Sequence, residues 1–317
     1  MPTEPIKVIL PKTIEPEDYQ PLLNSISSTL EEIVNYGTQV VHWVGTNPKY
    51  KKPDVDVTLV LLSRHILEIA DSISILIKQS SIDPCKILLR SALETMIYIK
   101  FITAERGEER SKAYLVCYMK NKKNEYLRYR TGTILNKQFK KEIVNDMFIA
   151  DGLNPFSDNL DTLLDEKLIN LDRWMSNPIF AETITEYNRV RKKNNNQKPP
   201  WYLLYGGAKN IEKLSDLLKY KFLYEVVYRK WSDSVHASDV ITGRISRTNE
   251  EKASFYQIRL GTEIIEVTIF AIDILLTSYR ALIEFIVPEM ISNYNQWYIK
   301  EIKLPFDKIR KTKIKLE

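Results

Sequence analysis

The sequence predicts an all-α protein: a multi-helix bundle with an antiparallel helical hairpin at its core and an irregular insertion. Only 9 of its 317 residues are glycine, which is few for a fold rich in sheets and turns. Apolar residues recur at three- and four-residue spacings along most of the chain, and this is the spacing of an amphipathic helix. The apolar fraction of 44% and the charged fraction of 27% are those of an ordinary globular protein that can bury a core.

The apolar periodicity gives the positions of the helices in chain order. We expect them at residues 17–44, 54–80, 83–105, 109–131, 136–150, 211–237 and 249–287. The connection between the second and third helices is short, and Asp83 followed by Pro84 is a typical helix start. The second and third helices are therefore expected to form an antiparallel hairpin.

We expect most of the chain to form one domain. It covers residues 16–300, between an N-terminal extension at 1–15 and a basic C-terminal tail at 301–317. Within it, the proline-containing stretch 152–210 is expected to be an irregular insertion. Its run RKKNNNQKPP, at 191–200, has too few apolar residues to order itself and is expected to be a mobile loop.

Several classes of protein are excluded or disfavoured. No GxGxxG or GxxxxGK[ST] motif is present, so we expect no nucleotide cofactor. The two cysteines, Cys85 and Cys117, lack metal-ligand spacing and are expected to be reduced thiols in the core. The three histidines are widely scattered, so no metal site is expected.

The sequence also predicts a cytoplasmic protein without membrane contact. The N-terminal apolar run is brief and bracketed by prolines, unlike that of a signal peptide. The most apolar later stretch, 262–279, contains three acidic residues, too many for a membrane span.

Charge is unevenly distributed along the chain. Residues 110–142 hold ten Lys or Arg against two acidic residues, whereas 151–186 hold eight acidic residues against two basic ones. Tyrosines and a phenylalanine are interleaved with the basic residues, a composition that suits phosphate contact and base stacking. The alternative is a solvated helix face with its tyrosines packed inward. On the first interpretation, the candidate RNA-binding residues are Lys120, Lys122, Lys123, Arg128 and Arg130.

A short pattern, R-x-x-L-E, occurs in both helices of the expected hairpin. Arg64 and Glu68 form it in the second helix, and Arg90 and Glu94 in the third. The third helix is apolar almost all round, so its charges are expected to be buried and paired. The simplest arrangement crosses the hairpin, with each arginine meeting carboxylates of the neighbouring helix. Such a cluster is either structural or supports an active site from beneath.

The stretch YRKWSDSVHAS, residues 228–238, carries the candidate catalytic residues. On an ideal helix, Arg229, Ser232, Asp233 and His236 share one face, and Trp231 lies on the opposite, apolar one. A histidine can move the proton of a ribose 2′-hydroxyl, and an arginine can stabilise charge on phosphate oxygens. Ser232 or Asp233 can orient the scissile group. This chemistry needs no metal.

The stretches LLRSALETMIYIKFI (88–102) and YEVVYRKWSDSVHAS (224–238) resemble the two most recognisable stretches of a bacterial all-helical family, a domain of unknown function. In that family an Arg-x-x-x-Glu helix precedes a Tyr-x-x-x-Ser-x-x-x-His stretch. The resemblance covers roughly residues 55–285. The matching positions are Arg90, Glu94, Tyr228, Ser232 and His236.

That family is similar in turn to the HEPN domains, helical ribonucleases of toxin–antitoxin, abortive-infection and CRISPR systems. Their Arg-x(4–6)-His motif corresponds to Arg229 and His236, although Lys230 stands where a HEPN motif usually has Asn, Asp or His. The resemblance implies RNA as substrate, a homodimer, and a possible partner or antitoxin protein.

Two functions remain open from the sequence. The first is a metal-independent endoribonuclease, a possible toxin or anti-phage effector, in which Arg229 and His236 do the chemistry. Tyr228, Ser232 and Asp233 would position the reacting groups. The second is a non-catalytic helical module for interaction or ligand sensing, in which His236 caps the end of its helix.

Overall fold

The structure is a computed structural model. It describes residues 19–46, 53–146, 160–232, 245–247, 253–255, 259, 261 and 263–313. The chain divides into two compact units: unit 1 combines residues up to 105 with those from 211 onward, and unit 2 is residues 106–210. The stretch that we expected to be a single domain thus comprises two units. The all-α class is confirmed, with one short antiparallel ribbon, β1 (Ile245–Arg247) and β2 (Ala253–Phe255).

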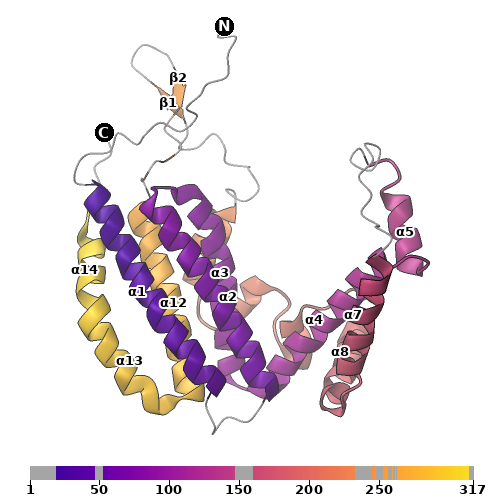
Figure 1. Ribbon diagram of the computed structural model, residues 1–317. Coiled ribbons are helices and arrows are strands. Elements are labelled where there is room, and N and C mark those ends of the chain that lie inside the picture. The colour runs from indigo at the N-terminus through magenta and orange to yellow at the C-terminus, as the bar shows by residue number, and fades with distance from the viewer. Residues whose placement is uncertain are drawn as a thin grey trace. The chain divides into compact units, whose positions relative to one another are not determined.

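Four long helices form the body of unit 1. They are α1 (Tyr19–Thr46), α2 (Pro53–Lys78), α3 (Ile82–Ala104) and α12 (Ile264–Ile286). Figure 1 shows them side by side, and α1 packs on α2, α2 on α3, and α12 on both α1 and α3. The predicted hairpin of α2 and α3 is confirmed, although α3 begins at Ile82 and not at the expected cap, Asp83.

The core of unit 1 is aliphatic, and α1 and α12 approach closely at Gly37. A β-carbon at Gly37 would overlap the Tyr279 ring, whose hydroxyl donates a hydrogen bond to the Ile33 carbonyl at 3.1 Å. The fully buried aliphatic side chains are contributed by all four helices; they include Leu30, Ile33, Ile66, Ile73, Leu89, Leu93, Ile97, Leu282 and Ile283. Cys85 and Cys117 are buried free thiols, as predicted, and burial raises the pKa of each to about 12.

The C-terminal segment is helical and packs on the bundle. After η4 (Pro288–Met290) follow α13 (Ile291–Trp297), the π-helical turn η5 (Tyr298–Ile302) and α14 (Lys303–Lys311). Trp297 stacks on Tyr36 of α1 with ring centroids 3.8 Å apart. Residues 301–317 were expected to be a basic tail; within them, Phe306 and Ile309 of α14 are buried while the lysines of this helix face outward.

Unit 2 is built on α4 (Gly107–Tyr129) and α5 (Ile134–Glu142). The segment that we expected to be irregular forms α7 (Leu160–Met175), η1 (Pro178–Phe180), α8 (Ala181–Lys193) and η2 (Trp201–Gly206). Pro178 begins η1, and Pro199 and Pro200 precede η2, where a missing N–H costs nothing, so these prolines do not break the helices. Tyr187, Val190 and Trp201 are buried, and α4 packs against α7, α8 and η2.

The expected mobile loop at 191–200 has a definite backbone. Its first three residues end α8, and Asn195 and Asn196 adopt left-handed conformations with φ of 51° and 61°. Asparagine tolerates this conformation better than other residues with side chains. Asn196 donates its N–H to the Arg191 carbonyl at 3.0 Å, and this hydrogen bond closes the end of the helix.

Two expected helices differ from the observed ones. The helix expected at 211–237 is interrupted into α9 (Ile211–Leu217), α10 (Lys221–Leu223) and the π-helix η3 (Tyr224–Lys230), because Lys219 has a positive φ of 64°. The helix expected at 249–287 begins only at Ile264, and β2 occupies part of its first half. None of the helices in the described ranges is long and apolar enough to cross a membrane.

Candidate functional site

A cluster around Arg90 joins two segments that are far apart in the sequence. Arg90 lies in the middle of α3, and the π-helix η3 packs against this helix. The Arg90 Nη1 atom donates a hydrogen bond to Ser232 Oγ at 2.9 Å across 142 positions of sequence. The Arg90 Cζ atom lies 3.9 Å from the centre of the Tyr228 ring. Arg90, Tyr228 and Ser232, all half-buried, form what we call the Arg90 cluster.

The partners of Arg90 in the cluster are neutral. No carboxylate among the described residues forms an ion pair with Arg90, whereas many other arginines are held by an acidic side chain. Those ion-paired arginines are Arg64, Arg106, Arg128, Arg130, Arg189, Arg229, Arg280 and Arg310. A guanidinium has five N–H donors, so Arg90 keeps both its charge and donors for an anion.

Two aromatic contacts hold the segment 224–232 against unit 1, so that Tyr228 and Ser232 reach Arg90 of α3. Trp231 is 2% exposed and packs edge-on against Phe270 of α12, with ring centroids 5.7 Å apart. Tyr224 stacks on Tyr228 with centroids 5.0 Å apart and planes 18° apart. The buried indole therefore anchors the segment, and the tyrosine stack supports the ring beneath Arg90. Tyr224 was not among the residues selected from the sequence, although it stacks on one of them.

Arg229 takes a different position from the one expected. Its side chain is 66% exposed and binds Glu225 of the same turn, with an N–O distance of 3.1 Å. The hydrogen bond to Glu225 raises the pKa of Arg229. The expected face was drawn at the spacing of an α-helix, and a π-turn changes that spacing. Asp233 and His236 lie outside the described residues, so the pairing of Arg229 with His236 stays a prediction.

The charges that we expected to meet across the hairpin do not do so. Arg64 binds Glu68 of its own helix at 2.9 Å, and both side chains are more than half exposed. Glu94 is half-buried one turn along α3 from Arg90 and has no ion-pair partner in the described part of the chain. The prediction failed because α3 is not buried all round: Ile87 on the same stripe is 45% exposed.

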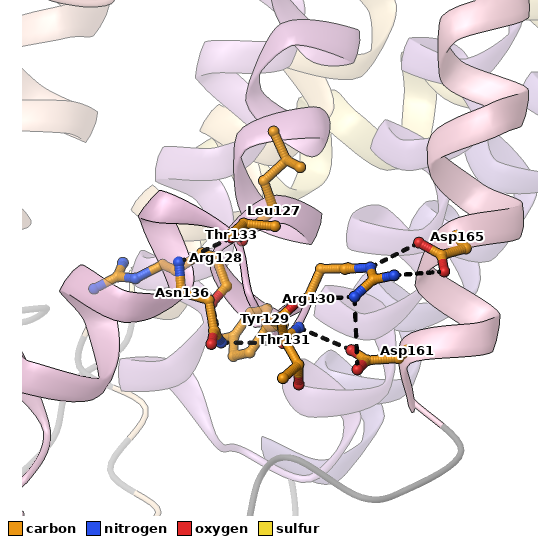
Figure 2. Close-up of polar contacts among 9 residues, drawn as sticks. All are labelled: Leu127, Arg128, Tyr129, Arg130, Thr131, Thr133, Asn136, Asp161 and Asp165. Carbon is orange, nitrogen blue, oxygen red and sulfur yellow. Dashed lines mark hydrogen bonds and ion pairs between the residues drawn. The ribbon is translucent and has the colours of Figure 1, made fainter.

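In unit 2, two of the candidate RNA-binding residues, Arg128 and Arg130, lie at the end of α4, and Figure 2 shows the contacts of Arg130 with Asp161 and Asp165. Arg130 donates two hydrogen bonds to the Asp165 carboxylate, at 2.8 and 3.0 Å. Arg128 binds Glu142 at 2.8 Å and covers the Phe139 ring at 4.0 Å.

The backbone at this end of α4 is also fixed. Asn136, 1% exposed, donates to the Arg128 carbonyl at 3.1 Å, and Thr133 caps α5 by accepting the Asn136 N–H at 3.0 Å. Asp161 accepts the Thr131 N–H at 2.9 Å, and this hydrogen bond lowers the pKa of the Asp161 carboxyl. The two arginines are therefore positioned by a rigid frame.

The three candidate lysines of α4 also have partners. Lys122 binds Glu125 at 2.8 Å, Lys123 binds Asp172 of α7, and Lys120 lies 5.9 Å from the centre of the Tyr187 ring. Lys123 and Arg130 are therefore neutralised by residues of the acidic block, and Lys122 and Arg128 by the two acidic residues of the basic block itself. Surface ion pairs of this kind are weak, on the order of 0–1 kcal/mol, but they lower the field that a phosphate would meet.

No group of three or more His, Cys, Asp or Glu side chains that could hold a metal ion occurs within the described ranges. The Arg90 cluster brings together a guanidinium, a phenol ring and a hydroxyl. Together these groups can bind and orient an anion.

Comparison with known proteins gives a family and no activity. The sequence model of a protein family, described as a family of unknown function (DUF5677), matches residues 56–253. This range contains all three residues of the Arg90 cluster. It does not link the chain to HEPN ribonucleases. No curated protein and no solved structure matches the chain. Because the matched range is more than half of the 317 residues, the chain belongs to the family of unknown function DUF5677.

Proposed function

We propose that this protein is a metal-independent endoribonuclease in which Arg90 holds the scissile phosphate and His236 moves the proton of the ribose 2′-hydroxyl. The observation that supports it is the half-buried Arg90 guanidinium, held by a hydroxyl and a ring face and by no carboxylate of the described chain. A charge that is fixed but not neutralised favours a phosphate over a neutral ligand.

The chemistry balances without a metal or a further reactant. The 2′-oxygen attacks the adjacent phosphorus, the bond from phosphorus to the 5′-oxygen breaks, and the products end in a 2′,3′-cyclic phosphate and a 5′-hydroxyl. His236, four residues after Ser232, would accept the 2′-hydroxyl proton, and the departing 5′-oxygen would take a proton from water, whose hydroxide then takes the proton back from His236. Arg90 would stabilise the charge that builds on the phosphate oxygens. Ser232 and Tyr228 act through Arg90 as positioning residues.

The test compares cleavage of a single-stranded RNA in EDTA by wild type and by three variants. His236→Ala and Arg90→Ala should each lower kcat by about 10²–10³-fold. Arg64→Ala is the matched control, because Arg64 occupies the same R-x-x-L-E pattern but is exposed and ion-paired. Cleavage by wild type that needs a divalent metal, or that leaves no cyclic phosphate, refutes the proposal.

Arg229→Ala decides between the two candidate arginines. Because Arg229 binds Glu225 and is 66% exposed, we expect its removal to alter kcat much less than removal of Arg90. If Arg229→Ala lowers kcat more than Arg90→Ala does, Arg229 is the catalytic arginine, as the sequence pattern predicted. If wild type and every variant bind RNA but do not cleave it, the remaining candidate function is a ligand-sensing module.

The proposal includes a homodimer, because HEPN domains, which the chain resembles, usually bring their motifs together at a two-fold interface. Light scattering at tens of micromolar protein should show two copies. A monomer with full cleavage activity would remove this part of the proposal and leave the Arg90 site intact. A regulatory partner or antitoxin protein would be sought by co-purification.

A further inference from the structure

A groove in unit 2 has the features of a second binding site. It has a volume of about 420 Å³ and is lined by two tyrosines of α4 and a stripe of α7. The lining contains aromatic rings, cations and an amide, and no carboxylate; its main residues are Tyr118, Tyr126, Lys167, Asn170, Arg173 and Trp174.

The groove follows from the antiparallel packing of α4 and α7. Lys123 binds Asp172, Lys167 lies 5.5 Å from the centre of the Tyr126 ring, and Arg130 binds Asp165, so the two helices run in opposite directions. The α7 stripe has the spacing i, i+3, i+7 from Lys167 to Trp174 and therefore lies on one helix face.

The aromatic side chains of the groove are unusually exposed. Trp174 is 54% exposed and Tyr118 is 47% exposed, although a tryptophan is normally among the more buried residues. A large aromatic ring left in water at the edge of a groove has a face available for stacking against a ligand.

The charges near the groove favour an anionic ligand. The neighbouring carboxylates of α7, Asp165 and Asp172, are neutralised by Arg130 and Lys123 of α4. Lys167 and Arg173 form no ion pair with any residue that the structure describes. Four of the five cations selected from the sequence are thus bound to acidic side chains, whereas Lys167 and Arg173 line the groove.

We propose that this groove binds single-stranded RNA, with bases stacked on Trp174 and Tyr118 and phosphates held by Arg173 and Lys167. Stacking needs bases that are not already paired, so a duplex does not fit. The Asn170 amide can hydrogen-bond a base edge. The choice of RNA as the polymer rests on the proposed function. The larger groove of about 610 Å³ nearby is less suited, because Glu125 and Glu142 line it and Arg128 covers its Phe139 ring.

The test measures binding of a fluorescently labelled, mixed-sequence single-stranded RNA of roughly 12 nucleotides. All proteins are full-length and carry His236→Ala, which prevents cleavage. Trp174→Ala should weaken binding roughly 5- to 150-fold, the effect of losing one stacked base. Trp174→Phe should retain most of the affinity. Ile169→Ala is the matched control, because Ile169 is a 59% exposed apolar residue on α7 outside the groove.

Salt dependence tests the cations separately. Arg173→Ala should reduce the slope of log affinity against log salt by roughly 0.7, the value for one phosphate contact with a single strand. Lys123→Ala removes the same formal charge but an ion-paired one, so it should change the slope less. Equal slopes for the two variants would argue against a phosphate at Arg173.

The outcomes separate this proposal from the proposed function. Trp174-dependent binding without any cleavage by wild type keeps the groove and rejects the nuclease. Cleavage that does not depend on Trp174, duplex binding as tight as single-strand binding, or equal affinity of Trp174→Ala and Ile169→Ala overturns the groove proposal. In that case the exposed rings would point to a protein partner as occupant.

Discussion

Replacing Arg90 by alanine tests whether the Arg90 cluster is a neutral or an ion-paired arrangement. The structure gives Arg90 one hydrogen bond to Ser232 and one ring contact with Tyr228. We expect Arg90→Ala to lower the free energy of unfolding of unit 1 by about 2 kcal/mol.

The magnitude follows from the two contacts. A hydrogen bond from a charged group contributes about 1.5–3 kcal/mol and a partly exposed cation–π contact about 0.5–1 kcal/mol. Removing a half-buried charge also relieves its desolvation, which offsets part of the loss. A net loss of about 2 kcal/mol lowers the Tm by roughly 4–8 °C in a unit of this size. A buried ion pair broken on one side would instead cost about 3–5 kcal/mol.

The assay is urea and thermal unfolding with double-mutant cycles. Arg90→Ala is combined with Ser232→Ala in one cycle and with Tyr228→Leu in the other, and each pair should couple by about 0.5–1.5 kcal/mol. Arg64→Ala, the exposed counterpart, should cost no more than about 0.5 kcal/mol. Zero coupling in both cycles refutes the reasoning. A loss of 3–5 kcal/mol would mean that a carboxylate neutralises Arg90.

Three further predictions concern stability. Gly37→Ala should cost about 1–3 kcal/mol in thermal unfolding, because its β-carbon would overlap a buried tyrosine ring of α12; an unchanged Tm would contradict this packing. Hydrogen bonds from Arg189 and the Tyr205 N–H lower the pKa of Glu186. The ionised Glu186 carboxylate therefore stabilises the fold fully above its ordinary pKa of 4.5, and this contribution is lost as pH falls through the folded pKa. Urea unfolding should therefore show Glu186→Gln less stable than wild type at pH 7 and similar at low pH. Burial raises the pKa of Asp273 above 3.8, so ionisation of this carboxyl lowers the stability of the protein as pH rises from 3.8 through the folded pKa. The Asp273→Asn variant should therefore be as stable as wild type, or more stable, at pH 7 in urea unfolding.

The amphipathic helices could be predicted from the sequence because each buries one stripe of side chains. Helices α1 to α4 lie within a few residues of their predicted ranges. The prediction that 152–210 is irregular failed because its prolines were interpreted as breaks. Pro178 instead begins a turn that leads directly into α8. The only buried side chain of α7 is Leu164, so its apolar stripe gave a weak signal.

The candidate site could be predicted in part. The family-like pattern selected Arg90, Tyr228 and Ser232, which the fold brings together. Their geometry could not be predicted, because it depends on a π-helix whose position has no sequence signal comparable to a cap or a proline. An ideal helical wheel selected Arg229 for the same reason.

The charge blocks illustrate a different limit. A run of basic residues interleaved with tyrosines suits RNA binding, and nothing in the run itself says where the neutralising acids will fold. The antiparallel packing of α4 and α7 places acidic residues of the second block against the basic ones, so the pairs Arg130–Asp165 and Lys123–Asp172 are internal. The basic run alone could not reveal this pairing, because the acidic partners lie 35 and 49 positions further along the chain.

The two proposed sites predict different kinetic effects, because one would bind the strand and the other would act on the reacting phosphate. In the proposed complex Trp174 would contact only bases, stacked both before and during cleavage, so Trp174→Ala should raise KM and leave kcat nearly unchanged. In the proposed reaction Arg90 would face charge that grows as the phosphate reacts, so Arg90→Ala should lower kcat and kcat/KM together. Steady-state cleavage of one single-stranded RNA by both variants measures the difference. If Trp174→Ala lowers kcat as strongly as Arg90→Ala does, unit 2 takes part in the chemical step. The proposal that unit 2 only binds the strand would then be wrong.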